Sequence, residues 1–229
     1  MKRTVYWLID TLYLVNGRTR MFFHRNPPKH YLGYLVKGKN PVILLPGIAN
    51  RWGFIKNLGD KISLVGHPVY IVPKLGYNLH DIPKSAKIVA ELIEENNLKN
   101  VIIVGHSKGG LIGKYLLIYN NKDNRIKGVV AIASPFSGSR LLNLVPHKAY
   151  SELHEDSNLI KNLMAHKEVN RDIISIFPVF DNLILSAQGS YLEGAENTEV
   201  KEAKGHHKIV FDKRITELVF TAIEKLSKK

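Results

Sequence analysis

Short apolar runs alternate with amphipathic segments along most of the chain. Consecutive apolar residues fill 41–45, 101–104 and 128–133, which is the pattern of strands buried on both faces of a parallel sheet. Between these runs, apolar residues recur at helical spacing over 82–95 and directly after Ser107. Strands that alternate with helices predict right-handed crossovers and an α/β fold, with a mostly parallel central sheet flanked by helices.

The same patterns predict the remaining elements of one domain. No linker, internal repeat or second-domain boundary divides the 229 residues, so we expect a single domain over 1–229. Further strands are expected over 30–36 at the sheet edge and over 67–72, 173–180 and 198–203, and further helices over 54–64 and 213–226.

The segment 135–172 departs from the alternation of strands and helices. Two helical patterns, over 141–145 and 150–164, follow each other there with no strand between them. In an enzyme of this architecture, a cap or lid over the active site would be inserted at this place. An ordinary packing excursion on the surface is the alternative interpretation.

An amphipathic helix is expected over 1–16. Apolar side chains between Val5 and Tyr13 fall on one helical face. Asp10 interrupts the apolar stretch, no Ala-x-Ala-like cleavage site follows, and the stretch is too short to span a bilayer. Docking of this helix on its own domain and docking on a membrane surface both stay open.

The composition restricts partners and chemistry. A formal net charge of +13 favours contact with something anionic. We expect either a generally basic solvated surface or an anionic membrane surface as partner, and no nucleic acid, because no nucleic-acid-binding motif is present. The absence of cysteine excludes disulfides and a thiol nucleophile. It also suits a cytoplasmic protein, with peripheral membrane contact if the first helix docks there.

No motif for a cofactor or a metal occurs. The chain has neither Gly-x-Gly-x-x-Gly nor His-Glu-x-x-His. The spacing from Gly105 to Gly110 is that of a P-loop, but Leu111 occupies the position that requires lysine. We therefore expect no cofactor and no metal.

The sequence Gly105-His106-Ser107-Lys108-Gly109 follows the apolar run 101–104 and precedes a helical pattern. This Gly-x-Ser-x-Gly arrangement predicts a sharp strand-to-helix turn that presents Ser107 as a nucleophile. The flanking glycines allow the chain to bend and a substrate carbonyl to approach.

A serine nucleophile needs a base and an orienting carboxylate, which follow an elbow of this kind in the order Ser, Asp or Glu, His. The base is expected in the loop after the last strand, where we favour His206 over His207. The preferred acid is Asp181, because it ends the apolar run 173–180 at the carboxyl edge of the sheet. Alternative acids are Asp156, Asp172, Glu193 and Glu196.

Two backbone amides are expected to bind the oxyanion that forms when the serine attacks a substrate carbonyl. One is the amide of Lys108, directly after the nucleophile and at the start of a helix. The other is the amide of Ile48, which follows Pro46-Gly47 in the loop after the early strand.

With these residues placed, the chain resembles a small member of the α/β-hydrolase superfamily, similar to bacterial lipases and to the GPI inositol-deacylase-like branch. The resemblance covers roughly residues 40 to 227. Besides the elbow, it rests on Leu44–Gly47, Leu75–Asn78, Ala133–Gly138, Leu192–Asn197 and Gly205–His207.

The resemblance implies hydrolysis of carboxylic esters through an acyl-enzyme on Ser107, with a lipid-like ester as the leading substrate. In two respects the chain departs from many lipases: Pro46-Gly47 replaces their His-Gly oxyanion signature, and little chain precedes residue 40 for the usual first strands. An acyltransferase with the same triad and a non-catalytic protein that binds lipid or a partner are the alternatives. The sequence leaves acyl length, head group and oligomeric state open.

Overall fold

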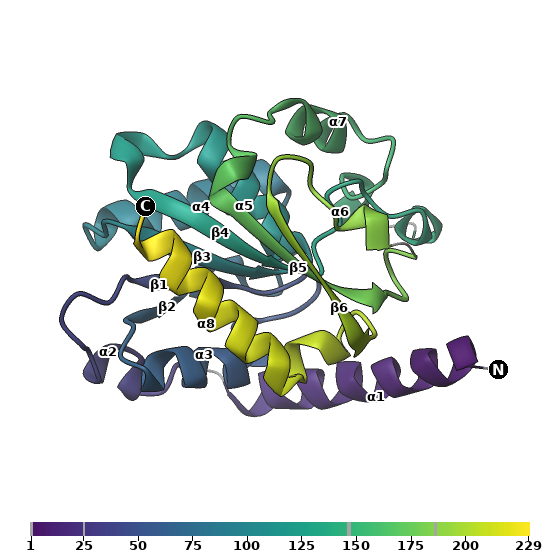
Figure 1. The fold of residues 1–229 in the computed structure, drawn as a ribbon, viewed down its shortest axis with the longest axis horizontal. Helices are drawn as coiled ribbons and strands as arrows, with labels where there is room; N and C mark the ends of the chain where they lie inside the picture. The colour runs from purple at the N-terminus through teal and green to yellow at the C-terminus, as the bar shows by residue number, and fades with distance from the viewer. Residues whose placement is uncertain (1, 25, 146–147, 186) are drawn as a thin grey trace.

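The centre of the molecule is a six-stranded parallel sheet (Figure 1). The computed structural model describes residues 2–24, 26–145, 148–185 and 187–229. The strand order is β2-β1-β3-β4-β5-β6, and all neighbouring strands are parallel, which confirms the predicted fold class. The strands are β1 (Val42–Leu45), β2 (Val69–Ile71), β3 (Val101–His106), β4 (Ile126–Ile132), β5 (Ile173–Phe180) and β6 (Glu196–Lys204).

Helices cover both faces of the sheet because alternate strand residues point to opposite sides. In β1, Val42 and Leu44 belong to the core on one face, and Ile43 and Leu45 to the core on the other. The first face packs against α1 (Lys2–Phe23), α3 (Lys56–Leu64) and α8 (Lys213–Ser227), and the second against α4 (Ile82–Glu95) and α5 (Lys108–Tyr119).

Helix α1 lies along the lower edge of the molecule in Figure 1 and is longer than the helix predicted over 1–16, whose first residue is outside the described part. A Cβ built on Gly17 would lie 2.3 Å from the Phe54 ring, so the helix packs closely on the 3-10 turn Trp52–Ile55. No helix in the described ranges is both long and apolar enough to cross a membrane.

The apolar face predicted for this helix lies mostly in solvent. Val5, Leu8 and Leu12 are 49%, 64% and 69% exposed. The face that packs on the domain is the opposite one, and it carries the buried residues Asp10 and Met21.

The prediction of an edge strand over 30–36 is wrong. This segment begins with the short helix α2 (His30–Gly33), in which Tyr31 is buried and donates its hydroxyl to the Lys56 carbonyl at 3.2 Å. The Val36 amide donates to the carbonyl oxygen of Gly66 at 3.0 Å, which is a single backbone bond to the chain before β2. One buried tyrosine therefore fixes the segment, where a strand would need a ladder of backbone bonds.

Short helices fill about half of the segment 135–172, of which residues 146 and 147 lie outside the described part. The single helix predicted over 150–164 is divided into α6 (Lys148–Ser151) and α7 (Asn158–Ala165). Ser157 separates them, because its hydroxyl caps α7 by accepting the Ile160 amide at 3.1 Å and donates to the Glu152 carbonyl at 2.8 Å. The other helical turns here are Leu141–Leu144 and Asn170–Asp172.

Candidate active site

Ser107 occupies a sharp turn between β3 and α5. Its backbone has φ 53° and ψ −121°, a conformation that a non-glycine residue rarely adopts. Side chains on the neighbouring glycines would collide with the backbone: a Cβ at Gly105 would lie 2.4 Å from the Gly109 carbonyl carbon, and one at Gly109 would lie 2.3 Å from Leu45 O. The strained turn that the sequence predicts is therefore present, and it requires these glycines.

Asp181 and His206, far apart in sequence, form a buried pair. Asp181 follows β5 and His206 follows β6, so both lie at the carboxyl edge of the sheet. The His206 Nδ1 lies 2.8 Å from Asp181 Oδ2. The other carboxylate oxygen, Oδ1, accepts the amides of Leu183 and Ile184, each at 2.8 Å. These bonds hold the carboxylate in one orientation and leave Nε2 as the other nitrogen of His206.

Opposing influences act on the pKa of His206. Burial lowers it, but the charge of Asp181 and its hydrogen bond, with a contribution from Asp10, raise it by more. The net pKa lies above the ordinary histidine value. The Asp181 charge thus stabilises the imidazolium form.

The four alternative acids lie elsewhere. Asp172 pairs with Lys229 at 2.8 Å, Glu193 pairs with Lys167 at 2.7 Å, and Asp156 is exposed. Glu196 pairs with Lys225. Among the contacts of the described residues, Asp181 is the carboxylate that bonds the imidazole of His206.

A second buried Asp–His pair lies beside the first. The His207 Nδ1 is 2.7 Å from Asp10 Oδ2, and Asp10 Oδ1 accepts the amides of His207 and Lys208 at 2.7 and 2.8 Å. Burial raises the pKa of Asp10, but these bonds and the nearby histidines lower it to about 2. Helix α1 is thereby bonded to the loop that carries His206.

In the sequence, Asp10 stands out only as an interruption of an apolar stretch. A carboxylate in the middle of such a helix was the available signal for a buried contact. The sequence could not show which face would be buried, nor that the partner lies 197 positions further along the chain.

His106 lies between the two pairs and bonds to the loop that carries His206 and His207. Its Nε2 donates to the His206 carbonyl oxygen at 2.9 Å, and its ring stacks on Phe54 with centroids 5.9 Å apart. Burial, followed by repulsion from His206 and His207, holds the pKa of His106 well below its ordinary value. A neutral His106 that donates from Nε2 presents a lone pair at Nδ1.

The loop that carries Ile48 comes close to Ser107. A Cβ built on Gly47 would lie 3.2 Å from the Ser107 Cβ, so the loop backbone approaches the serine closely. The Asn78 Nδ2 holds the loop by donating to Pro46 O at 2.7 Å. Lys108 is the first residue of α5, where a helix leaves its amides without an internal acceptor.

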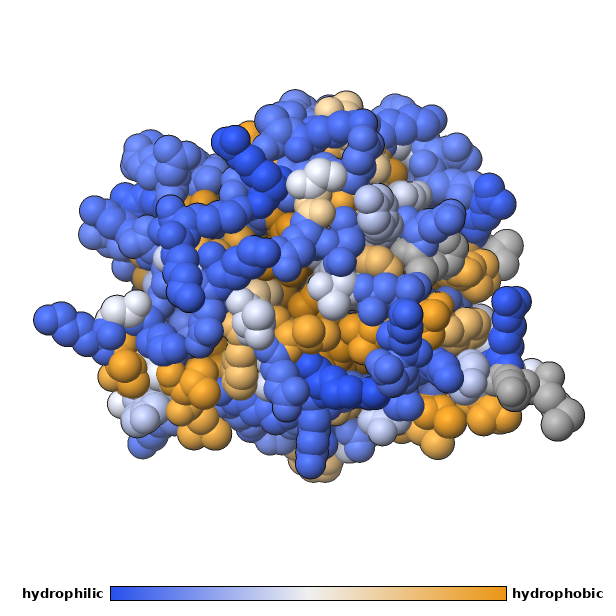
Figure 2. Space-filling view, viewed as in Figure 1, coloured by the Kyte–Doolittle hydropathy of each residue, from blue (hydrophilic) through white to orange (hydrophobic). Residues whose placement is uncertain are grey.

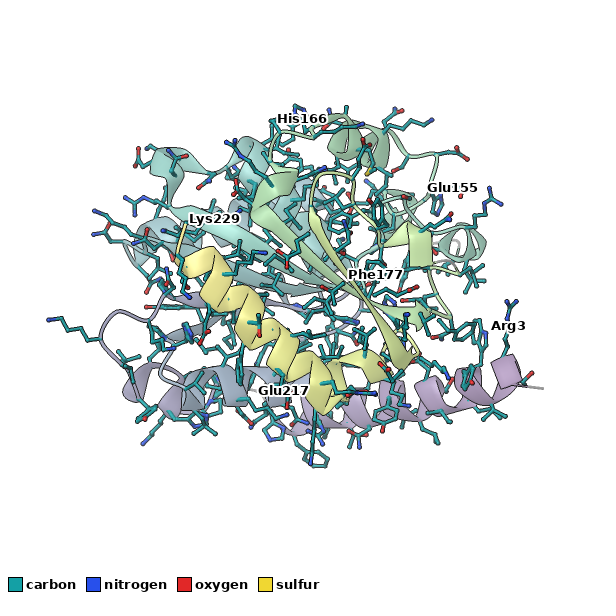
Figure 3. All side chains as sticks on the ribbon, viewed as in Figure 1. Arg3, Glu155, His166, Phe177, Glu217 and Lys229 are labelled. Atoms are coloured by element: carbon teal, nitrogen blue, oxygen red, sulfur yellow. The ribbon has the colours of Figure 1, made fainter. Side chains whose placement is uncertain are left out.

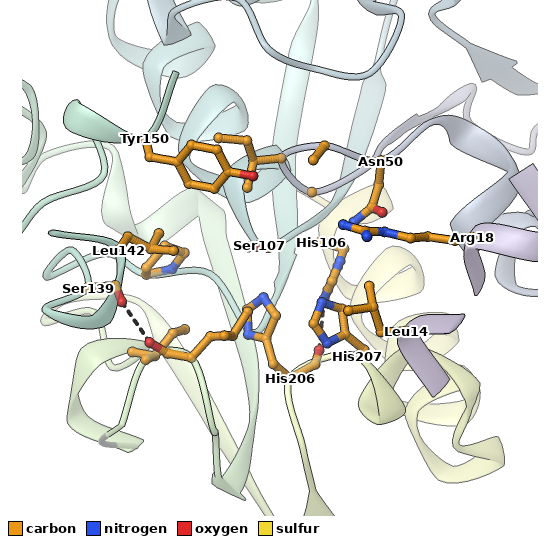
Figure 4. A pocket seen from close by; sticks show the side chains of 16 residues that line it. Leu14, Arg18, Asn50, His106, Ser107, Ser139, Leu142, Tyr150, His206 and His207 are labelled. Atoms are coloured by element: carbon orange, nitrogen blue, oxygen red, sulfur yellow. Dashed lines mark hydrogen bonds between the residues drawn. The ribbon is translucent and has the colours of Figure 1, made fainter. Parts of the chain in front are cut away.

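A cavity of about 200 Å³ opens above Ser107, His206 and Ile48, and we call it the Ser107 cavity (Figure 4). Leu142 and Tyr150 lie on one side of it, and Arg18 and Asn50 lie on the other. Its further lining includes Leu14, Gly47, Pro135, Ser139, Leu183, Ile184 and His207.

The Lys108 side chain points away from the cavity and connects three segments. It is fully buried, and its Nζ lies 3.0 Å from Glu152 Oε1 and donates to the His80 carbonyl. Glu152 in turn accepts the amide of Ile82, the first residue of α4, at 2.9 Å. The nucleophile turn is thus linked to the segment between α6 and α7.

Among the described residues, no group of three or more His, Cys, Asp or Glu side chains is placed to hold a metal ion. The buried ionisable side chains at this edge of the sheet include the two Asp–His pairs, Asp181–His206 and Asp10–His207.

The strained serine turn, the buried Asp–His pair and the parallel sheet agree with a match to a known family. The model of the alpha/beta hydrolase fold matches residues 40–162, more than half of the chain. The chain belongs to the alpha/beta hydrolase family. The match does not extend to a branch of this family, so the inositol-deacylase-like assignment stays a prediction.

Known proteins similar to this alpha/beta hydrolase include a Mycoplasma pneumoniae protein with an esterase/lipase name, 26% identical over 137 residues. That alignment covers 56% of this chain and 49% of the relative, so the chain spans about half the length of the curated relative.

Solved structures share the fold. The Bacillus licheniformis lipase BlEst2 in its mature form has a TM-score of 0.65 at 16% identity, with 88% of this chain and 96% of the lipase covered. A monoacylglycerol lipase from Paleococcus ferrophilus has a TM-score of 0.57 at 17% identity, with 83% and 96% covered.

Proposed function

We propose that this alpha/beta hydrolase cleaves carboxylic esters through an acyl-enzyme on Ser107. The observation that carries the proposal is the pair His206–Asp181, 2.8 Å apart and buried, which lines one cavity together with the strained Ser107. A serine hydroxyl is a weak nucleophile until an oriented base removes its proton. The fold and the esterase and lipase names of similar proteins support the same reaction class.

In the first half of the reaction, Ser107 Oγ attacks the ester carbonyl carbon and His206 Nε2 takes the hydroxyl proton. Asp181 stabilises the imidazolium that forms. The bond from carbon to the alcohol oxygen then breaks, and His206 returns the proton to that oxygen. The products of this half are a free alcohol and an acyl group bound to Ser107.

In the second half, water attacks the acyl carbon and gives a proton to His206. The bond to Ser107 Oγ breaks, the carboxylic acid leaves, and His206 returns the proton to Ser107. In both halves the amides of Ile48 and Lys108 would donate to the oxyanion, a contribution of about 3 kcal/mol for each donor.

We propose an ester with an apolar acyl group as the substrate, because Leu142, Leu183 and Ile184 line the cavity. A cavity of about 200 Å³ is smaller than the roughly 300–1,000 Å³ that encloses drug-sized ligands. A long chain would therefore extend beyond the enclosed part of the site.

The test is hydrolysis of p-nitrophenyl esters from two to sixteen acyl carbons, with Ser107→Ala and His206→Gln beside the native chain. We expect turnover by the native protein and a loss of about 10⁴-fold or more in either variant. Lys167→Gln, on the surface, is the matched control. A native protein that hydrolyses none of the esters, or a Ser107→Ala variant with full turnover, would contradict the proposal.

We propose in addition that the outer face of α1 docks on an anionic membrane surface. Leu8, Leu12, Val15 and Phe22 recur along this face at helical spacing and are 57% to 69% exposed. Apolar surface is visible along this edge in Figure 2. The only carboxylate of the helix is the buried Asp10, so its exposed charges are positive. An apolar stripe flanked by cations fits anionic lipid headgroups.

Flotation with vesicles of phosphatidylcholine, with and without phosphatidylglycerol, tests this docking. We expect the native protein to float with the anionic vesicles and Leu8→Gln/Leu12→Gln to bind at least about tenfold more weakly, because each leucine loses apolar burial. Leu64→Gln/Val65→Gln, also exposed but on and after α3, is the control. Equal flotation of the two double variants, or no flotation of the native protein, would refute the docking.

A further inference from the structure

One wall of the Ser107 cavity carries a cation without a counterion. Arg18 reaches this wall from α1, one helical turn after Leu14, which also lines the cavity. No ion pair or hydrogen bond joins the Arg18 guanidinium to another of the described residues. Neighbouring Arg20, by contrast, donates to Asn16 and Asn57. The proposed steps of ester hydrolysis use Ser107, His206 and Asp181 and do not involve Arg18.

Asn50 lies on the same wall and is a buried side chain without a partner. Only 3% of it is exposed, and its Oδ1 lies in the interior with no hydrogen bond. Its Nδ2 would lie 3.6 Å from a Cβ built on Gly47, which places this amide beside the backbone next to Ser107. Oδ1 can only accept, so a hydroxyl of a bound molecule would satisfy it, whereas Nδ2, which makes no hydrogen bond to another of the described residues either, can donate to an anion.

The charges around this wall favour an anion. The lining of the cavity, over the described residues, contains no aspartate or glutamate. Asp10 and Asp181 lie behind the imidazoles of His207 and His206 and are already bonded to them. Arg18 is therefore the permanent charge at the cavity surface, and guanidinium binds phosphate or carboxylate through two parallel hydrogen bonds.

The opposite wall differs in chemistry, as Figure 4 shows, since Leu142 and Tyr150 lie across the cavity from Arg18 and Asn50. An ester on Ser107 has two arms, the acyl chain and the alcohol. The apolar wall suits the acyl arm. The alcohol arm would then point toward the cation and the unpartnered amide.

We propose that Arg18 and Asn50 form a subsite for an anionic group on the alcohol arm of the ester. The substrate class is then an acyl ester of a phosphorylated or carboxylated alcohol, such as an acylglycerol phosphate. This inference rests on the proposed ester hydrolysis and specifies its substrate. The shared chemistry, a phosphate oxyanion, is also that of free inorganic phosphate, which would occupy the subsite as an inhibitor.

The experiment compares two esters with the same butanoyl chain, one of glycerol and one of glycerol 3-phosphate, at low ionic strength. We expect the native protein to favour the phosphorylated ester in kcat/KM by roughly tenfold to a hundredfold. Arg18→Gln should reduce this ratio to near one, and Arg18→Lys should restore part of it. Asn50→Leu should reduce the ratio as well.

Arg3→Gln is the matched control, because Arg3 lies at the far end of the same helix (Figure 3) and its removal changes the net charge equally. We expect it to leave the ratio unchanged. A native ratio near one, or equal falls in Arg18→Gln and Arg3→Gln, would overturn the subsite.

Two further readings separate the possible failures. p-Nitrophenyl acetate carries no anionic group. If the native protein does not hydrolyse it, the proposed ester hydrolysis is wrong, and not the subsite alone. Inorganic phosphate at millimolar concentration distinguishes the two sources of the anion. Inhibition by phosphate that Arg18→Gln abolishes, with no preference between the butanoyl esters, would replace the substrate subsite by a site for free phosphate.

Discussion

His206 and His207 are adjacent in sequence, and each bonds a buried aspartate, yet their pKa values move in opposite directions. The pKa of His206 is raised because Asp181 outweighs burial. The pKa of His207 is lowered because burial, together with repulsion from His206, outweighs its bond to Asp10. The surroundings of His206 thus favour its protonated form, and those of His207 favour its neutral form.

The proposed base gives a prediction for the pH dependence. Only neutral His206 can accept the Ser107 proton, so kcat/KM should rise with pH through a midpoint above the ordinary value of 6.5. In Asp181→Asn the activity should fall by about 10⁴-fold, and the midpoint of the residual activity should move below 6.5, because burial then exceeds the remaining upward contribution of Asp10 to the pKa of His206. A pH–rate profile measures both, with Asp172→Asn as the surface control. An unchanged midpoint in Asp181→Asn would contradict the assignment.

Asp10 gives a prediction for stability. Its pKa falls from 3.8 to about 2 on folding, so its ionised form stabilises the fold above pH 3.8, and this contribution is lost as the pH falls toward 2. We expect Asp10→Asn to lower the free energy of unfolding by about 2 kcal/mol at pH 7 and by less at pH 3. Urea denaturation at the two pH values measures the difference.

Asp123→Asn is the control for this experiment, because Asp123 is exposed and its backbone, at φ 57°, suits asparagine. A deficit in Asp10→Asn that is no larger at pH 7 than at pH 3 would show that the Asp10 charge contributes nothing to the contact between α1 and the loop.

At the scale of elements, the sequence predicted best where one local pattern decides the structure. The helix over 82–95 has the predicted bounds because its apolar residues recur at helical spacing, and the strand over 101–104 is extended only to His106 because its residues are continuously buried. The predictions of one helix over 150–164 and of a strand over 30–36 were wrong. Ser157 interrupts the first and Tyr31 fixes the second, and in both cases the contacts depend on tertiary neighbours.

A largely buried ion pair, Lys108–Glu152, joins α5 to the segment between α6 and α7. Removing one partner leaves the other charge uncompensated, so Glu152→Ala should lower the free energy of unfolding by about 3 kcal/mol or more. Lys108→Met/Glu152→Leu should recover most of this loss, because no buried charge remains. Glu155→Ala, which breaks the exposed pair with Arg140, should cost at most about 1 kcal/mol.

Thermal unfolding of these variants tests the role of the ion pair. Equal losses in Glu152→Ala and Glu155→Ala would show that the buried pair does not stabilise the segment. A double variant as unstable as Glu152→Ala would assign the loss to packing of the lysine stem instead of its charge.

At the scale of the whole molecule, the sheet brings distant residues to one edge. Ser107, Asp181 and His206 follow β3, β5 and β6, and the parallel order places the ends of these strands together. Chain order and strand ends were readable from the sequence, and the bond between Asp181 and His206 fits them. The bond between Asp10 of α1 and His207 could not be predicted from the sequence, because the sequence does not show whether a charged residue of an amphipathic helix faces solvent or a buried histidine.

Covalent labelling by a fluorophosphonate shows whether Ser107 is an activated nucleophile. We predict stoichiometric labelling of the native chain, mapped by mass spectrometry to the peptide with Ser107, no labelling of Ser107→Ala, and much slower labelling of His206→Gln. Labelling at another residue, or a native chain that does not react although it is folded, would contradict the account.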